Sequence, residues 1–242
     1  MPVKINSDVI LGIIVLALAG IAPNIYPAAM KGIAGMPFLS KWLLLPSIII
    51  IITIYIFSRK QHRTLLSRRI MVGALSGVIA TIGLEVVRIF GFKMGWMPGD
   101  MPKLLGVLIT NRFMEGPSTW SNILGYAYHY WNGAAFGIIF VLLLGRKPIW
   151  WGLIYALLIG TGFLLSPSVK AMGVGFMGTG LPGMIEIVYG AHIAFGLILG
   201  YLAHRWLRNP EWLLMMAHVS DPGNQTGQRN EMLDSSTYEP KH

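Results

Sequence analysis

The 242-residue chain has no cysteine and few charged residues. Without cysteine it can form no disulfide, iron–sulfur cluster or thiolate metal site, so any metal would need His, Met, Asp or Glu ligands. Charged residues make up 12% of the chain and hydrophobic residues 54%, and the mean hydropathy is +0.60. This balance excludes an ordinary cytosolic enzyme, a disordered chain and a secreted disulfide scaffold. It predicts a multi-pass membrane protein.

Acidic residues are scarce: 10 Asp and Glu stand against 19 Lys and Arg, which gives a formal net charge of +9. The basic residues gather at the ends of apolar stretches, where membrane topology alone places them, so we expect no nucleic-acid partner. Familiar catalytic motifs are absent as well. The sequence contains no Walker loop, zinc-protease motif, dinucleotide fingerprint or evident nucleophile–base arrangement, and an enzyme is not favoured.

Six apolar stretches are suited to crossing a hydrocarbon layer roughly 30 Å thick as helices, although the second and fifth are near the short limit. They cover approximately residues 9–30, 42–57, 70–92, 120–144, 149–167 and 183–204. The predicted fold is therefore all-α, a polytopic membrane helix bundle of about six transmembrane helices. It divides into two N-terminal helices with a basic loop (1–69), a four-helix membrane core with outer loops (70–206) and a polar tail (207–242).

Basic residues predict the orientation in the membrane. The loop at 58–69 contains five Arg and Lys residues, and further basic residues follow the fourth stretch, at Arg146 and Lys147, and the sixth, at Arg205 and Arg208. The positive-inside rule places these ends, and therefore both termini, in the cytoplasm.

Three segments between or beyond the spans have their own character. The short apolar run 104–109, flanked by proline and glycine, predicts an interfacial or re-entrant helix on the outer side. Residues 173–183 are too rich in glycine for a stable helix and predict a pliable outer lid. The polar residues from 209 onward predict a largely disordered cytoplasmic tail. Residues 17–19 imitate a signal-peptide cleavage site, but the apolar run continues beyond them, so cleavage is not expected.

The fourth and sixth stretches share a pattern that hydrophobicity alone does not require. The order Tyr, His, Gly, Gly at fixed spacing occurs at Tyr126, His129, Gly133 and Gly137, and again at Tyr189, His192, Gly196 and Gly200. Each set lies on one stripe of a helix. The pattern predicts two parallel helical hairpins related by an axis along the membrane normal. The glycines are typical of close helix packing, and duplication alone would also have copied the histidines.

Ionisable residues inside predicted spans are costly, so they point to function or to pairing. Five of them are expected at similar depths in the outer leaflet: Glu85, Arg88, His129, Glu186 and His192. We expect them to line a pocket that binds or moves an ion or a small solute. The alternative for Glu85 and Arg88, at i,i+3, is an internal salt bridge. For the histidines it is hydrogen bonding between helices.

Three other hypotheses remain open at this stage. His129 and His192, with the carboxylates, suit a transition metal, and Met94, Met97 and Met101 are soft ligands for Cu(I), although most membrane-protein methionines only fill space. The same two histidines also suit bis-histidine ligation of haem b. The third hypothesis is an accessory subunit that packs, through its aromatic and glycine surfaces, into a larger membrane complex.

From residue 70 to 206 the chain resembles a group of uncharacterised bacterial multi-pass membrane proteins, a domain of unknown function. The resemblance lies in residues 97–106, 125–133 and 192–196. It implies a four-helix membrane core with His129 and His192 as family features, and a place in a bacterial inner membrane. This chain departs from the group's pattern in the two N-terminal spans, the Glu85 and Arg88 pair, the longer insert at 107–119 and the polar tail. The resemblance implies no activity.

Overall fold

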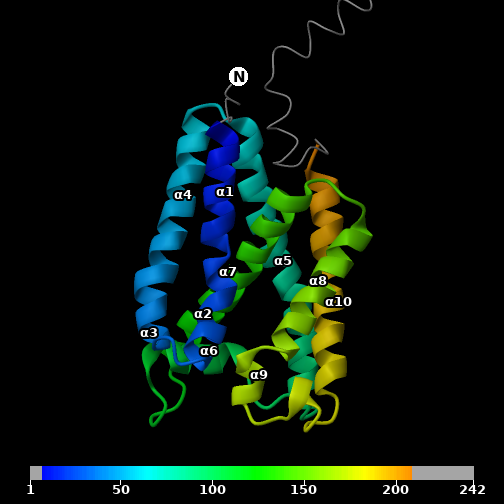
Figure 1. Cartoon of the computed structure of the whole chain (residues 1–242). Helices are drawn as coiled ribbons and strands as arrows, with labels where there is room; N and C mark the ends of the chain where they lie inside the picture. The colour runs from blue at the N-terminus through cyan, green and yellow to red at the C-terminus, as the bar shows by residue number, and fades with distance from the viewer. Residues whose placement is uncertain (1–6, 209–242) are drawn as a thin grey trace, which may run out of the picture.

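The computed structural model describes residues 7–208, and within that range it contains helices and no strand. The helices are α1 (Ser7–Ala19), α2 (Ile21–Met30), α3 (Met36–Leu39), α4 (Leu45–Lys60), α5 (Thr64–Lys93), α6 (Met101–Thr110), α7 (Thr119–Leu144), α8 (Ile149–Leu164), α9 (Pro167–Ala171) and α10 (Met184–Trp206). Figure 1 shows the long helices packed side by side. The prediction of an all-α helix bundle is confirmed. The expected disordered tail lies outside the described residues.

Six helical segments of the described chain are long and apolar enough to cross a membrane. They are Ser7–Met30, Met36–Lys60, Thr64–Lys93, Thr119–Leu144, Ile149–Ala171 and Met184–Trp206. The predicted number of spans is confirmed. The second span reaches 25 residues because α3 and the π-helical turn Ser40–Leu44 precede α4, and the fifth reaches 23 because α9 follows α8. Many large apolar side chains on the outer faces are exposed, as the architecture of an integral membrane protein in contact with lipid requires.

The connections between helices lie at two opposite ends of the bundle (Figure 1). One end, which we call the basic end, holds the start of α1, the α4–α5 loop, the α7–α8 loop and the end of α10. All the basic residues used to predict orientation lie there. The opposite end, which we call the loop end, holds the α2–α3 connection, α6, α9 and residues 173–183.

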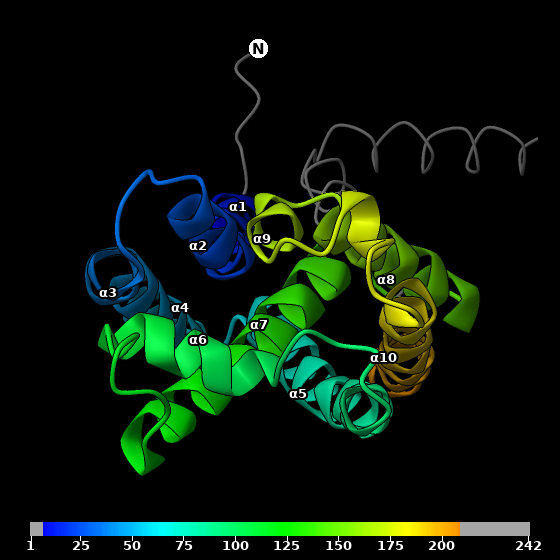
Figure 2. The same cartoon turned by 90° about the horizontal axis from the view of Figure 1, so that it is seen from below.

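The short apolar run at 104–109 falls inside α6, which crosses the loop end beside α7 (Figure 2). The two helices touch through glycine: a Cβ atom on Gly106 would overlap the backbone oxygen of Ser121, and one on Gly125 would overlap that of Pro102. Residues 173–183 contain no α-helix, only the 3₁₀ turn Phe176–Gly178. Their pliability as a lid stays a prediction.

Helices α5 and α7 approach each other closely because glycines face each other. A Cβ atom on Gly77 would overlap the backbone oxygen of Gly133, and one on Gly137 would lie 2.9 Å from the Cα atom of Gly77. No residue larger than glycine fits there without moving a helix backbone. Gly133 and Gly137 of the sequence pattern therefore lie at a helix–helix contact.

The contact between α8 and α10 has the same construction. A Cβ atom on Gly196 would lie 2.6 Å from both the backbone oxygen of Gly152 and the Cβ atom of Ala156, and one on Gly200 would lie 2.6 Å from the backbone oxygen of Ile149. The second pair of pattern glycines thus occupies in this hairpin the place that the first pair occupies between α5 and α7.

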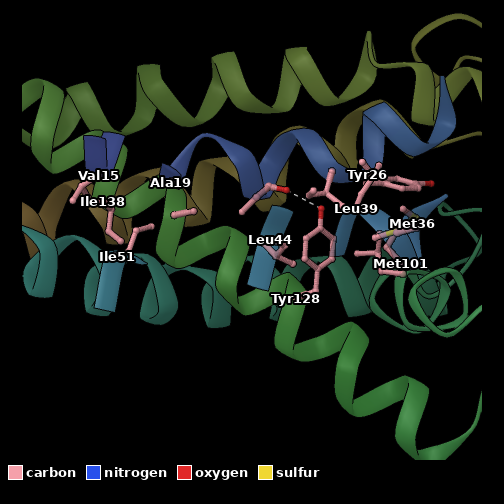
Figure 3. Packing of buried hydrophobic residues seen from close by; sticks show 14 of the residues in the cluster. Val15, Ala19, Tyr26, Met36, Leu39, Leu44, Ile51, Met101, Tyr128 and Ile138 are labelled. Atoms are coloured by element: carbon pink, nitrogen blue, oxygen red, sulfur yellow. Dashed lines mark hydrogen bonds between the residues drawn. The ribbon is translucent and has the colours of Figure 1, made fainter. Parts of the chain in front are cut away.

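The N-terminal helices pack onto α7 rather than standing apart from the core. Val15 of α1, Ile51 of α4 and Ile138 of α7 belong to one buried apolar cluster (Figure 3). The hydroxyl of Tyr128 on α7 donates a hydrogen bond of 2.8 Å to the backbone oxygen of Ala22 on α2. The two predicted parts 1–69 and 70–206 therefore share one core.

Candidate functional site

A cavity of about 450 Å³ lies in the loop-end half of the bundle. It is lined by residues of α2, α5, α7 and α10, by the end of α8, and by α6 and α9 with the residues just before them. Most of its walls are apolar, with Phe136, Phe163 and Phe195 among them. Volumes of roughly 300 to 1,000 Å³ are usual for small-molecule sites in proteins.

Arg88 and Glu85 form a buried ion pair at one wall of the cavity. The Nε atom of Arg88 donates to Oε1 of Glu85 at 2.6 Å and its Nη2 atom to Oε2 at 2.9 Å. Each residue is only 4% exposed. The pairing follows from their i,i+3 spacing on α5, and the two-pronged geometry is the favoured one between a guanidinium and a carboxylate.

The ion pair continues into the loop that leads to α6. Nη2 of Arg88 also lies 3.1 Å from Oδ1 of Asp100, and Oδ2 of Asp100 lies 3.2 Å from Nζ of Lys103. Two carboxylates therefore face two basic groups. This geometry favours the salt-bridge interpretation of Glu85 and Arg88, because the network ties α5 to the start of α6.

His129 joins the same network from α7. Its Nε2 atom lies 2.9 Å from Oε1 of Glu85. One helical turn before Glu85 on α5, the hydroxyl of Thr81 donates a hydrogen bond of 2.8 Å to the backbone oxygen of Gly77 and fills the space beside Gly133. The fold therefore brings Glu85, Arg88 and His129 together, as expected from their similar depths along the predicted spans.

His192 occupies the corresponding place on α10 but has different neighbours. Its Nδ1 atom lies 2.7 Å from the backbone oxygen of Val188, one turn earlier in the same helix. Across the contact with α8 stands Gly160, on which a Cβ atom would lie 3.0 Å from Cγ of His192. Both histidines line the cavity, but only His129 faces a carboxylate.

Glu186 is not brought into this group. Its side chain is exposed, and it is not among the residues that line the cavity. Glu186 precedes His192 by six positions, which is a rotation of about 600° at roughly 100° per residue, or one full turn plus about 240°. The two side chains therefore lie on different faces of α10.

The three methionines of the copper hypothesis do not share one environment. Met97 and Met101 are buried and line the cavity, whereas Met94 is 53% exposed. Among residues 7–208, no three His, Cys, Asp or Glu side chains come together as a metal-binding group. The haem b hypothesis for His129 and His192 stays a prediction.

Apart from His129, whose Nε2 atom faces Glu85, four cavity-lining residues have a buried polar atom without a hydrogen-bond partner in the described part of the chain. These atoms are Nη1 of Arg88, Oδ1 of Asn132, and the hydroxyls of Ser166 and Ser168. Asn132, Ser166 and Ser168 are not among the site residues predicted from the sequence. The sequence contains a signal for Asn132, because it follows His129 by three positions and therefore lies on the same face of the helix. The two serines have none, since Ser166 lies between α8 and α9 and Ser168 in the five-residue helix α9.

Comparisons with protein-family models, with curated proteins and with solved structures find no match to this chain. The resemblance to the uncharacterised bacterial membrane proteins stays a prediction.

Proposed function

We propose that this protein binds a small, largely apolar solute with one hydrogen-bonding end in the cavity of the loop-end half of the bundle. The observation that carries the proposal is the set of unpartnered polar atoms on the cavity wall. An unmade hydrogen bond of a buried polar group costs about 1 to 3 kcal/mol, so four such atoms around one space favour an occupant that supplies partners.

The charge balance of the wall indicates what kind of solute fits. Arg88 already faces the carboxylates of Glu85 and Asp100, so its charge does not call for an anion. Its Nη1 atom still offers a donor, and Oδ1 of Asn132 offers an acceptor. An uncharged molecule with a hydroxyl group matches this pair, because a hydroxyl both accepts and donates, while the aromatic walls match an apolar body.

The test is the set of small molecules that co-purify with the protein. Two variants change the cavity: Gly162→Phe, because a Cβ atom there meets nothing within 4 Å, and Asn132→Leu, which removes the polar atoms but keeps the number and branching of the side-chain heavy atoms. Solvent extracts of purified wild type and variants are compared by mass spectrometry. We expect at least one molecule near equimolar amount with wild type and a loss of about tenfold or more in both variants. In Gly162→Phe the ring takes up the space of the solute, and in Asn132→Leu a buried hydrogen bond is left unmade, which costs about 1 to 3 kcal/mol.

Two matched controls separate cavity binding from damage to the bundle. Gly162→Ala makes the same glycine replacement with little added volume. Asn122→Leu removes an unpartnered buried amide oxygen from the same helix, α7, outside the cavity. Both controls should keep the wild-type set of molecules. Wild-type protein without any stoichiometric small molecule, or cavity variants with an unchanged set, would overturn the proposal.

A further inference from the structure

Four arginines surround an open pocket of about 630 Å³ at the basic end, on the opposite side of the bundle from the cavity. They come from three separate places in the chain: Arg68 from the start of α5, Arg146 from the α7–α8 loop, and Arg205 and Arg208 from the end of α10. The positive-inside rule explains basic residues in each loop, but it does not require that they surround one pocket.

Two of the arginines are held in place by backbone oxygens at the end of α10. Nη2 of Arg68 donates to the backbone oxygen of Trp206 at 2.9 Å, and Nε of Arg146 donates to that of His204 at 3.2 Å. These bonds satisfy carbonyls that the last turn of a helix leaves without partners. Each guanidinium keeps further N–H donors for another acceptor.

No carboxylate within residues 7–208 pairs with any of these arginines. The ion pairs that involve the described acidic residues use Arg63, Arg88, Lys103, Arg112 and His129. Four positive charges thus lie around one pocket without a described counterion. Clustered guanidinium groups of this kind recognise phosphate, which accepts their paired hydrogen bonds.

The rest of the pocket wall is apolar and leads along α5 into the bundle's lipid-facing surface. Val72 and Leu75 follow Arg68 by four and seven positions, on the same face of the helix. Leu75 is 48% exposed. A phosphate that carried acyl chains would place them against these side chains, whereas a free phosphate would leave that part of the pocket unused.

We propose that this pocket binds the phosphate headgroup of an anionic phospholipid, with an acyl chain along Val72 and Leu75. Basic pockets between helix ends are suited to such headgroups, and each basic group near them contributes on the order of tenfold or slightly less to affinity. The site is separate from the cavity and does not depend on a solute there.

The test measures lipid binding to delipidated full-length protein in neutral detergent by native mass spectrometry. The probes are dioleoyl phosphatidylglycerol, dioleoyl phosphatidylcholine and inorganic phosphate. The double variant Arg205→Gln/Arg208→Gln removes two pocket charges that make no hydrogen bond or ion pair within residues 7–208. We expect wild type to prefer phosphatidylglycerol over phosphatidylcholine, and the variant to bind phosphatidylglycerol about thirtyfold more weakly.

The matched control is Arg59→Gln/Lys60→Gln, which removes two exposed charges from the same end of the bundle outside the pocket. It should weaken phosphatidylglycerol binding no more than about threefold, since the screened contribution of distant surface charges is small. An equal loss of phosphatidylglycerol binding in both double variants would show that general surface charge, and not this pocket, attracts the lipid, and would overturn the proposal. Displacement of the lipid by modest inorganic phosphate would assign the pocket to a free anion. No preference for phosphatidylglycerol in wild type would also overturn the proposal.

Discussion

The Nε2 atom of His129 on α7 lies 2.9 Å from the Oε1 atom of Glu85 on α5. In the second hairpin the histidine is kept, at His192, but Gly160 stands where the carboxylate would be. The two hairpins thus have the same glycine packing but differ in the residue that faces the histidine. The first hairpin holds the ion network of Glu85, Arg88 and His129, whereas in the second the ring of His192 packs against Gly160.

Removal of the Glu85 carboxylate should strongly destabilise the protein. Glu85→Ala leaves the buried Arg88 with a single carboxylate, and breaking a buried ion pair costs about 3 to 5 kcal/mol. Unfolding in mixed micelles measures this free energy. Glu115→Ala breaks the exposed pair with Arg112 and serves as the control, with a cost of about 1 kcal/mol or less. Similar losses in both variants would contradict the role assigned to the buried network.

Replacement of a contact glycine should be far more damaging than replacement of a cavity glycine. Gly77→Ala forces α5 away from the backbone of Gly133, and overpacking of this kind costs roughly 1 to 3 kcal/mol or more. Gly162→Ala meets no atom within 4 Å and should be neutral or stabilising by up to about 1 kcal/mol. Thermal denaturation in detergent compares the two. If Gly77→Ala melted at or above the temperature of Gly162→Ala, the close contact of α5 and α7 would be incorrect.

Loss of one hydroxyl should loosen the N-terminal helices. Tyr128→Phe removes the hydrogen bond to the backbone oxygen of Ala22, and such a bond contributes about 0.5 to 1.5 kcal/mol. Tyr201→Phe, at an exposed tyrosine of α10, is the control. Proteolysis rates of α1 and α2 in detergent report the change. Faster cleavage in the control than in Tyr128→Phe would speak against this bond as the link between α7 and α2.

Single cysteines can establish the orientation, because the natural chain has none. Met114→Cys lies in the α6–α7 loop at the loop end, where the native side chain is 98% exposed, and Gln61→Cys lies in the α4–α5 loop at the basic end. In intact cells, an impermeant maleimide should label Met114→Cys and should reach Gln61→Cys only after the membrane is opened. The reverse result would invert the predicted topology.

The helices were predictable because a chain that crosses lipid finds no hydrogen-bond partners there for its backbone. An apolar run must satisfy its own peptide groups, so hydropathy alone located all six spans, and only their ends moved. The second span was underestimated because Pro37, Ser40 and Lys41 interrupt the apolar pattern without ending the helix.

The candidate site was predictable only in part. Glu85 and Arg88 share one helix and His129 a similar depth, and depth follows directly from counting residues along a helix. Asp100 reaches Arg88 through a loop whose path no local pattern gives. Glu186 has a suitable depth but lies on another face of α10. The depth of a residue in a helix follows from the sequence, but the rotation of that helix against its neighbours does not.

The most direct test of solute binding is an experimental density map of wild-type protein purified gently into lipid nanodiscs. We expect continuous non-protein density in the loop-end cavity, with a polar end within hydrogen-bonding distance of Nη1 of Arg88 and Oδ1 of Asn132. Separate water-sized peaks in that cavity, at a resolution sufficient to distinguish the two, would contradict it.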